Sequence, residues 1–156
     1  MSRTDRRGAT GRNVLSGALL GVGVAAFVDE TVFHQLLHWH HFYDKSTPGI
    51  GLVSDGIFHA VGWLAAVAAL FLFADLRRRR VFAPLSWWAG LLVGAGGFQL
   101  YDGTIQHKLL RLHQIRYHVN LVPYDWTWNI LAAIMIVVGL GLLVRAYRMA
   151  ARGADA

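Results

Sequence analysis

The chain has 156 residues, of which 55% are hydrophobic, and its 15 basic and 9 acidic residues give a net charge of +6. A mean hydropathy of +0.40 is too high for an ordinary soluble domain of this size. The absence of cysteine excludes disulfides, thiolate catalysis and thiolate metal ligands. The positive charge does not indicate nucleic-acid binding, because the basic residues are gathered at the ends of apolar segments.

Four apolar segments follow one another along the chain, each long enough to cross ~30 Å of hydrocarbon as a helix. They cover residues 13–37, 49–74, 84–110 and 126–147. Helices buried in a soluble bundle are disfavoured, because these segments lack a charged face. We predict an all-α fold, an integral membrane four-helix bundle over residues 13–149. A disordered N-terminus (1–12) and a short tail (150–156) would flank it.

The basic residues predict the orientation of the chain in the membrane. Three clusters would lie on one side, which the positive-inside rule makes the cytoplasmic side of a bacterial plasma membrane. They are Arg3, Arg6, Arg7 and Arg12, then Arg77–Arg80, then Arg145, Arg148 and Arg152. Both termini are therefore expected to be cytoplasmic. No cleavable signal peptide is expected, because the first apolar segment serves as the first span.

One pattern, G-x-G-x5-D-x-T-x2-H-x-L-L-x2-H, occurs twice, beginning at Gly21 and at Gly94. The two copies are 73 positions apart. A second pair of motifs, Asp55/His59 and Asp125/Asn129, is offset by 70 positions at the start of the second and fourth segments. We predict two tandem helical hairpins, 13–76 and 84–149, related by a pseudo-two-fold axis along the membrane normal.

The repeated pattern places Asp and His inside otherwise apolar helices, near the predicted outer surface. Charged groups at that depth are costly unless paired, and they mark functional sites by default. Imidazole with carboxylate suits copper, iron or zinc, which the sequence does not distinguish. The alternative is that each Asp–His pair only fixes the helix register. The predicted ligands are His34, His59, His107, Asp29, Asp102 and Asp55, followed by His113, His40 and Asp125.

Helical phase limits this set. In a straight α-helix, Asp29 and His40 share one stripe, whereas His34, His38 and His41 share another about 140° away. They could not all point at one ion. His38 and His41 have no counterparts in the second copy, and together with His118 they are expected at the outer surface or as transient sites. Asn129 stands where the first half has His59, so we expect one asymmetric site rather than two identical ones.

Three runs, D-E-T-V-F-H-Q-L-L-H-W-H-H, S-D-G-I-F-H-A and Y-D-G-T-I-Q-H-K-L-L-R-L-H, resemble the DUF2243 family of predicted bacterial four-span membrane proteins. The resemblance covers residues 17–147. The chain departs from the family pattern at Glu30, Asp102 and Gln114, where Gly, Glu and His are more usual. The family carries no established activity, so the resemblance implies the fold and not the function.

These observations favour a membrane protein with a transition-metal site on the extracytoplasmic side, acting in metal handling or metal-dependent redox chemistry. Three alternatives stay open. They are a haem b cytochrome with His34/His107 or His59 as axial ligands, a metal-dependent membrane hydrolase, and a structural or partner-binding subunit without cofactor. The expected partners are the lipid bilayer and a membrane or extracytoplasmic metalloprotein. Whether the protein is an enzyme stays open.

Overall fold

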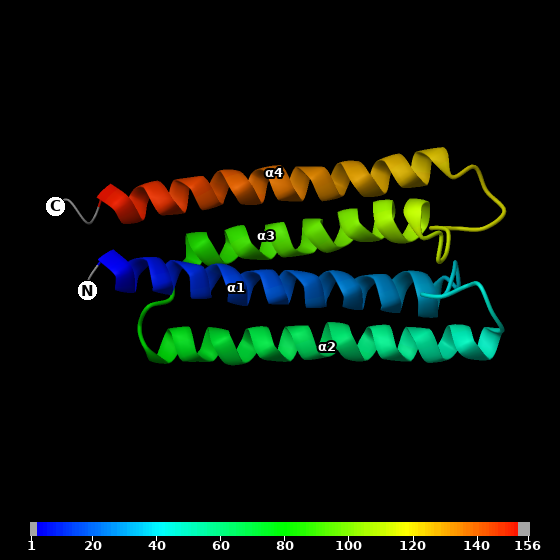
Figure 1. Cartoon of the computed structure of the whole chain (residues 1–156), viewed down its shortest axis with the longest axis horizontal. Helices are drawn as coiled ribbons and strands as arrows, with labels where there is room; N and C mark the ends of the chain where they lie inside the picture. The colour runs from blue at the N-terminus through cyan, green and yellow to red at the C-terminus, as the bar shows by residue number, and fades with distance from the viewer. Residues whose placement is uncertain (1–2, 153–156) are drawn as a thin grey trace.

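Four long helices run side by side in the computed structural model, which describes residues 3–152 (Figure 1). Helix α1 (Arg3–Val28) continues into a π-helix, η1 (Asp29–Leu36), and α3 (Pro84–Tyr101) continues into a second, η2 (Asp102–Leu109). The other two helices are α2 (Pro48–Arg78) and α4 (Val122–Arg152). The predicted all-helical bundle is confirmed for this part of the chain.

Two boundaries differ from the prediction. Residues 3–12, expected to be disordered, form the first turns of α1, because the helix begins at Arg3 rather than near Asn13. Helix α4 continues to Arg152, into the predicted tail. The remaining tail residues, 153–156, lie outside the described residues.

The helices lie in a row with α1 and α3 at its centre (Figure 1). Helix α2 packs on α1, and α4 packs on α3. Glycine allows α1 and α3 to approach closely. Inside lipid no hydrophobic effect drives helices together, so association depends on the close packing that small residues permit. A Cβ on Gly21 would collide with the backbone oxygen of Leu91, and one on Gly94 with that of Ala18. These contacts are reciprocal, since Gly21/Gly94 and Ala18/Leu91 are both 73 positions apart.

Three helical stretches of the described chain are long and apolar enough to cross a membrane, namely Gly8–Leu36, Pro48–Arg78 and Val122–Arg152. The outer helices present large apolar side chains outward, such as Phe71 (74% exposed) and Val137 (69%). The third segment was also predicted to span, but α3, which has 18 residues, is not one of these three stretches. It lies between α1 and α4, so small residues take the place of large apolar ones.

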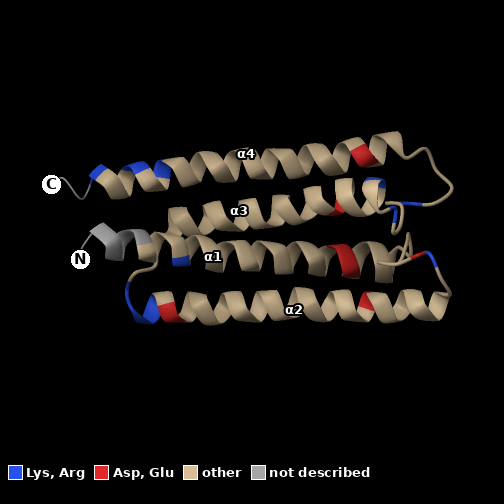
Figure 2. Ribbon diagram, in the orientation of Figure 1, with Lys and Arg blue, Asp and Glu red and all other residues tan. Residues whose placement is uncertain are grey.

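Arginine and acidic residues are distributed unevenly between the two ends of the bundle, although basic residues occur at both (Figure 2). At the end that holds both termini, Asp75 of α2 binds three arginines, Arg12, Arg78 and Arg79, at 2.5 to 2.8 Å. The acidic residues Asp29, Glu30, Asp55, Asp102 and Asp125 all lie on helical segments toward the opposite end.

Candidate metal centre

The two π-helices bring an aspartate and a histidine together at equivalent positions of the chain. Asp29 is the first residue of η1 and Asp102 is the first residue of η2, and each is followed five positions later by a histidine. In an α-helix, residues five apart point about 140° away from each other. A π-helix has i→i+5 hydrogen bonds, so residues five apart lie on nearly the same face. The phase argument for a straight α-helix therefore does not hold in these segments.

A sharp reversal of the chain then returns a second histidine to each helix end. His38 and Arg111 adopt left-handed backbone conformations, with φ of 49° and 51°. Each reversal is closed by two backbone hydrogen bonds, Leu37 N–H to Val32 O and Trp39 N–H to Phe33 O in the first. The corresponding bonds, 73 positions on, close the second. His40 and His113 thus come from loops rather than from helix faces.

The second set, Asp102, His107 and His113, is compact and buried. His107 Nε2 lies 3.1 Å from Asp102 Oδ2 and 3.0 Å from His113 Nε2, and His113 Nε2 lies 3.5 Å from Asp102 Oδ1. Metal bonds of about 2.1 Å separate adjacent ligands by about 3.0 Å at right angles and about 3.4 Å in a tetrahedron. The two imidazole nitrogens and the Asp102 oxygen nearest to each of them therefore lie at the spacing of metal ligands.

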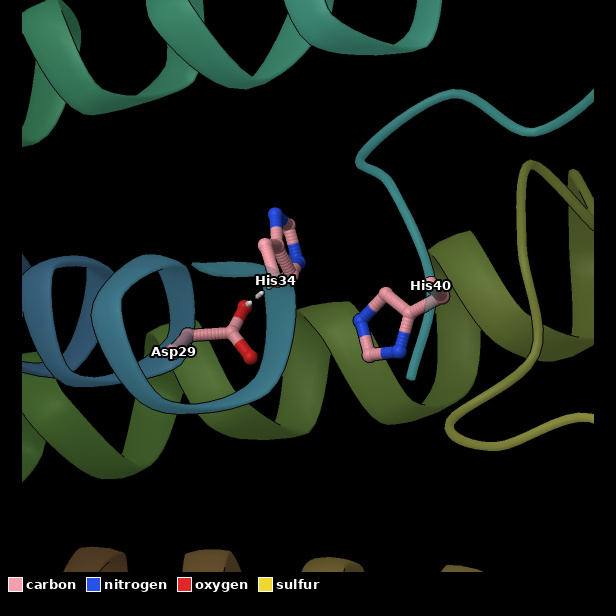
Figure 3. Close-up of side chains that lie close together, drawn as sticks. All are labelled: Asp29, His34 and His40. Atoms are coloured by element: carbon pink, nitrogen blue, oxygen red, sulfur yellow. Dashed lines mark ion pairs between the residues drawn. The ribbon is translucent and has the colours of Figure 1, made fainter. Parts of the chain in front are cut away.

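The first set, Asp29, His34 and His40, repeats this arrangement more loosely (Figure 3). His34 Nε2 lies 3.9 Å from Asp29 Oδ2, and the three ligand atoms lie within 4.8 Å of one another. All three residues are buried, and neither His34 Nε2 nor His40 Nε2 has a hydrogen-bond partner in the described part of the chain. Two buried imidazole nitrogens without a hydrogen bond thus lie in one cluster with the Asp29 carboxylate.

The two sets touch through their histidines. The rings of His40 and His113 are stacked, with centroids 4.5 Å apart. The ring centroids of His34 and His113 are 6.2 Å apart, as are those of His40 and His107. The six side chains form one cluster across α1 and α3, which we call the paired triads (Asp29, His34, His40 and Asp102, His107, His113).

Backbone carbonyls fix the tautomers of the two loop histidines. His40 Nδ1 lies 2.9 Å from the Ile115 oxygen, and His113 Nδ1 lies 2.8 Å from the Phe42 oxygen. A carbonyl only accepts, so each Nδ1 carries the hydrogen and each Nε2 keeps its lone pair. Burial, reinforced by His113, lowers the pKa of His40 to about 2, which keeps the ring neutral. Both rings are therefore ready to bind a cation through Nε2.

The surroundings of the two triads differ on the far side of the helical histidines. His34 Nδ1 lies 2.8 Å from Glu30 Oε2 and 3.2 Å from Asp55 Oδ1, and these two carboxylates are buried. His107 Nδ1 is buried without a partner among the described residues. Gly103 takes the place of Glu30, since a side chain there would collide with Trp128 and Asn129. Only the first triad therefore has an anionic outer layer.

Not all predicted ligands join the cluster. His59 is half-buried against the Phe27 ring, with centroids 5.9 Å apart, and belongs to none of the metal-ligand groups. Asp125 pairs with Lys108 instead. Asp55 lies in the outer layer of the first triad, where its Oδ2 is 2.6 Å from His41 Nδ1. His38 and His118 are exposed, as expected.

Sequence analysis missed Glu30 and placed His41 at the outer surface. The signal for Glu30 was its spacing of four from His34, which brings two side chains together on a helix. His41 gave no comparable signal, because a loop conformation decides its contact with Asp55. It is partly buried and lines a cleft of about 380 Å³ with His40 and Asp44. A second cleft, of about 460 Å³, reaches His107 and His113.

Comparison with known proteins identifies a family. A family model described as a predicted membrane protein (DUF2243) matches residues 16–146, a stretch that contains both triads. No curated protein and no solved structure matches the chain. The resemblance seen in the sequence motifs is therefore confirmed over most of the chain, and the protein belongs to the DUF2243 family of predicted membrane proteins.

Proposed function

We propose that the paired triads hold two transition-metal ions and that the protein carries out metal-dependent redox chemistry in the membrane. The observation that carries this proposal is the second triad, in which the contacts among the two Nε2 atoms and the Asp102 carboxylate oxygens are 3.0 to 3.5 Å long. Without an ion, one His107 Nε2–H faces two acceptors, His113 Nε2 and Asp102 Oδ2, and it can donate well to only one of them. A bound cation would satisfy all three.

The donor set favours chemistry over a purely structural ion. Each triad offers two imidazoles and one carboxylate, the arrangement that leaves coordination positions open in non-haem iron sites. Structural zinc sites, by contrast, are closed by four protein ligands. Iron is therefore our first choice, and copper and zinc are the other ions that two imidazoles and a carboxylate suit.

The packing of the histidines supports bare ions rather than haem. The predicted axial pair, His34 and His107, would need the porphyrin plane between its two rings. The rings of His40 and His113 are instead stacked on each other, and each contacts both His34 and His107. Four buried carboxylates, Asp29, Glu30, Asp55 and Asp102, surround the rings. Such a charge balance suits divalent cations, because a buried carboxylate is stabilised by a neighbouring positive charge.

We also infer the sidedness of the centre. The arginines around Asp75 lie at the end of the bundle that holds both termini, and the triads lie toward the other end. By the positive-inside rule the arginine-rich end faces the cytoplasm. The triads would then face the extracytoplasmic side of a bacterial plasma membrane.

The test is metal analysis of the protein purified from its membrane, combined with visible and electron paramagnetic resonance spectra. We expect two ions per chain in wild type, one in His34→Ala or His107→Ala, and none in the double variant. His59→Ala is the matched control and should keep both ions. Wild type without stoichiometric metal, or a double variant that keeps it, overturns the proposal.

A further inference from the structure

An apolar groove runs along the side of the bundle between α1 and α4, over the face of α3. Its volume is about 750 Å³, within the usual range for small-molecule sites. Its walls are formed by apolar side chains such as Val24, Phe98, Leu131 and Met135. Val24 and Leu131 are about half exposed, so the groove opens sideways onto the apolar surface of the bundle.

One charged residue lines this groove, and it is Asp29 of the first triad. Asp29 is only 3% exposed, so it contributes to the groove lining from a buried position, and its carboxylate lies beside His34 and His40. The floor offers few other polar atoms, because Trp128 Nε1 donates to the Gln99 oxygen and Gln99 Nε2 donates to the Trp128 oxygen. The groove thus joins the apolar side surface to the centre.

The other half of the chain is filled at the related place. There the rings of Phe42, Phe58 and Phe98 form a continuous stack, with centroids 4.9 and 5.8 Å apart. Phe58 corresponds to Trp128, 70 positions on, and Phe42 corresponds to Ile115, 73 positions on. By these sequence offsets, stacked rings occupy the place equivalent to the lining of the groove beside Asp29.

We propose that this groove admits a long-chain hydrocarbon molecule from the lipid phase and presents its end to the metal centre at Asp29. The occupant follows from three observations: the walls are apolar, the opening faces the membrane side, and Asp29 is the single charged group at the inner end. Water-soluble molecules would reach the centre through the clefts beside His40 and His107 instead. This inference rests on the proposed metal centre for its function but not for its binding.

The test is photolabelling of the full chain in lipid nanodiscs with a diazirine-bearing 16-carbon alkane, followed by peptide mapping. We expect labelling to concentrate in the groove segments of α1 and α4, at least about fivefold over the outer face of α2. Ala25→Trp fills the groove, since Ala25 lines it. The matched control is Ala68→Trp, because Ala68 is exposed on α2 away from the groove.

Ala25→Trp should remove most of the groove labelling and keep the metal content of wild type, whereas Ala68→Trp should change neither. Uniform labelling of all apolar faces in wild type overturns the inference, even if Ala25→Trp fails to fold. Equal groove labelling in the two folded variants does the same. Metal content is measured on the same samples. Groove labelling in a protein that binds no metal would overturn the proposed function and leave the inference about the groove intact.

Discussion

The outer layer of the first triad gives the sharpest prediction. Asp55 Oδ1 lies 3.2 Å from His34 Nδ1, and Asp55 also holds the loop through His41 and the Phe42 N–H. A carboxylate behind a metal-bound imidazole orients the ring and raises its basicity. Asp55→Asn keeps an oxygen that can accept the hydrogen bond but removes the negative charge. We expect Asp55→Asn to weaken the binding of the ion held by Asp29, His34 and His40.

The size of the effect follows from what remains. Loss of an outer-layer partner typically lowers metal affinity by about 10- to 100-fold, or about 1.4 to 2.8 kcal/mol. Glu30 Oε2 stays 2.8 Å from the same Nδ1, so a negative charge remains beside His34. In the Asp55→Asn variant, the metal affinity of the first triad should therefore fall about tenfold. Glu30→Gln combined with Asp55→Asn should approach 100-fold.

The assay is chelator competition with Co²⁺, followed by the visible spectrum, which resolves two binding steps if the triads differ. Asp125→Asn is the matched control, because Asp125 stands 70 positions after Asp55 but binds Lys108 and touches neither triad. One step should weaken in Asp55→Asn and neither in Asp125→Asn. Equal weakening in both variants, or no change in Asp55→Asn, would refute the role given to this layer.

Three further predictions follow from the structure. Gly21→Val should lower the free energy of unfolding by about 1–3 kcal/mol, seen as a lower thermal midpoint in detergent. The reason is that a Cβ at this position would collide with the Leu91 oxygen. Gly141→Val is the control and should not lower the midpoint, because a Cβ at that position meets nothing within 4 Å. His38→Gly should keep both ions, whereas His38→Val should lose metal from the first triad, because a φ of 49° strains a β-branched residue. Metal analysis of the two variants shows whether His38 acts as a turn residue or as a ligand. Metal at about 100 times its dissociation constant should stabilise wild type by about 2.7 kcal/mol per site, and His34→Ala with His107→Ala should abolish the shift in a thermal melt.

The sequence was sufficient for the helices and for most of the paired triads. Apolar length marked the helical segments, and the 73-residue offset singled out Asp29, His34, His40 and their counterparts. The conformation that unites them was not predictable from spacing. An i,i+5 pair looks divergent on an α-helix, and nothing in the residue types announces η1 or η2.

The outer layer shows a second limit of sequence analysis. Asp55 and His59 lie four apart on one helical face, which suggested that both would bind. In the structure Asp55 contacts His34, whereas His59 packs against Phe27. Asp125 gave the same sequence signal and was captured by Lys108. Spacing finds a face, but tertiary packing selects the residue.

The differences between the triads argue that two bound ions would not be equivalent. The second triad has its donors already at metal-ligand spacing, so binding there requires little rearrangement. The first triad must close from 3.9 Å, but Glu30 and Asp55 add negative charge beside it. Preorganisation would favour the ion in the second triad, and electrostatic attraction would favour the ion in the first. The two affinities would then be similar, while the electronic surroundings of the two ions differ. The groove reaches Asp29 and thus the more anionic triad, where a higher oxidation state of the metal would be better stabilised.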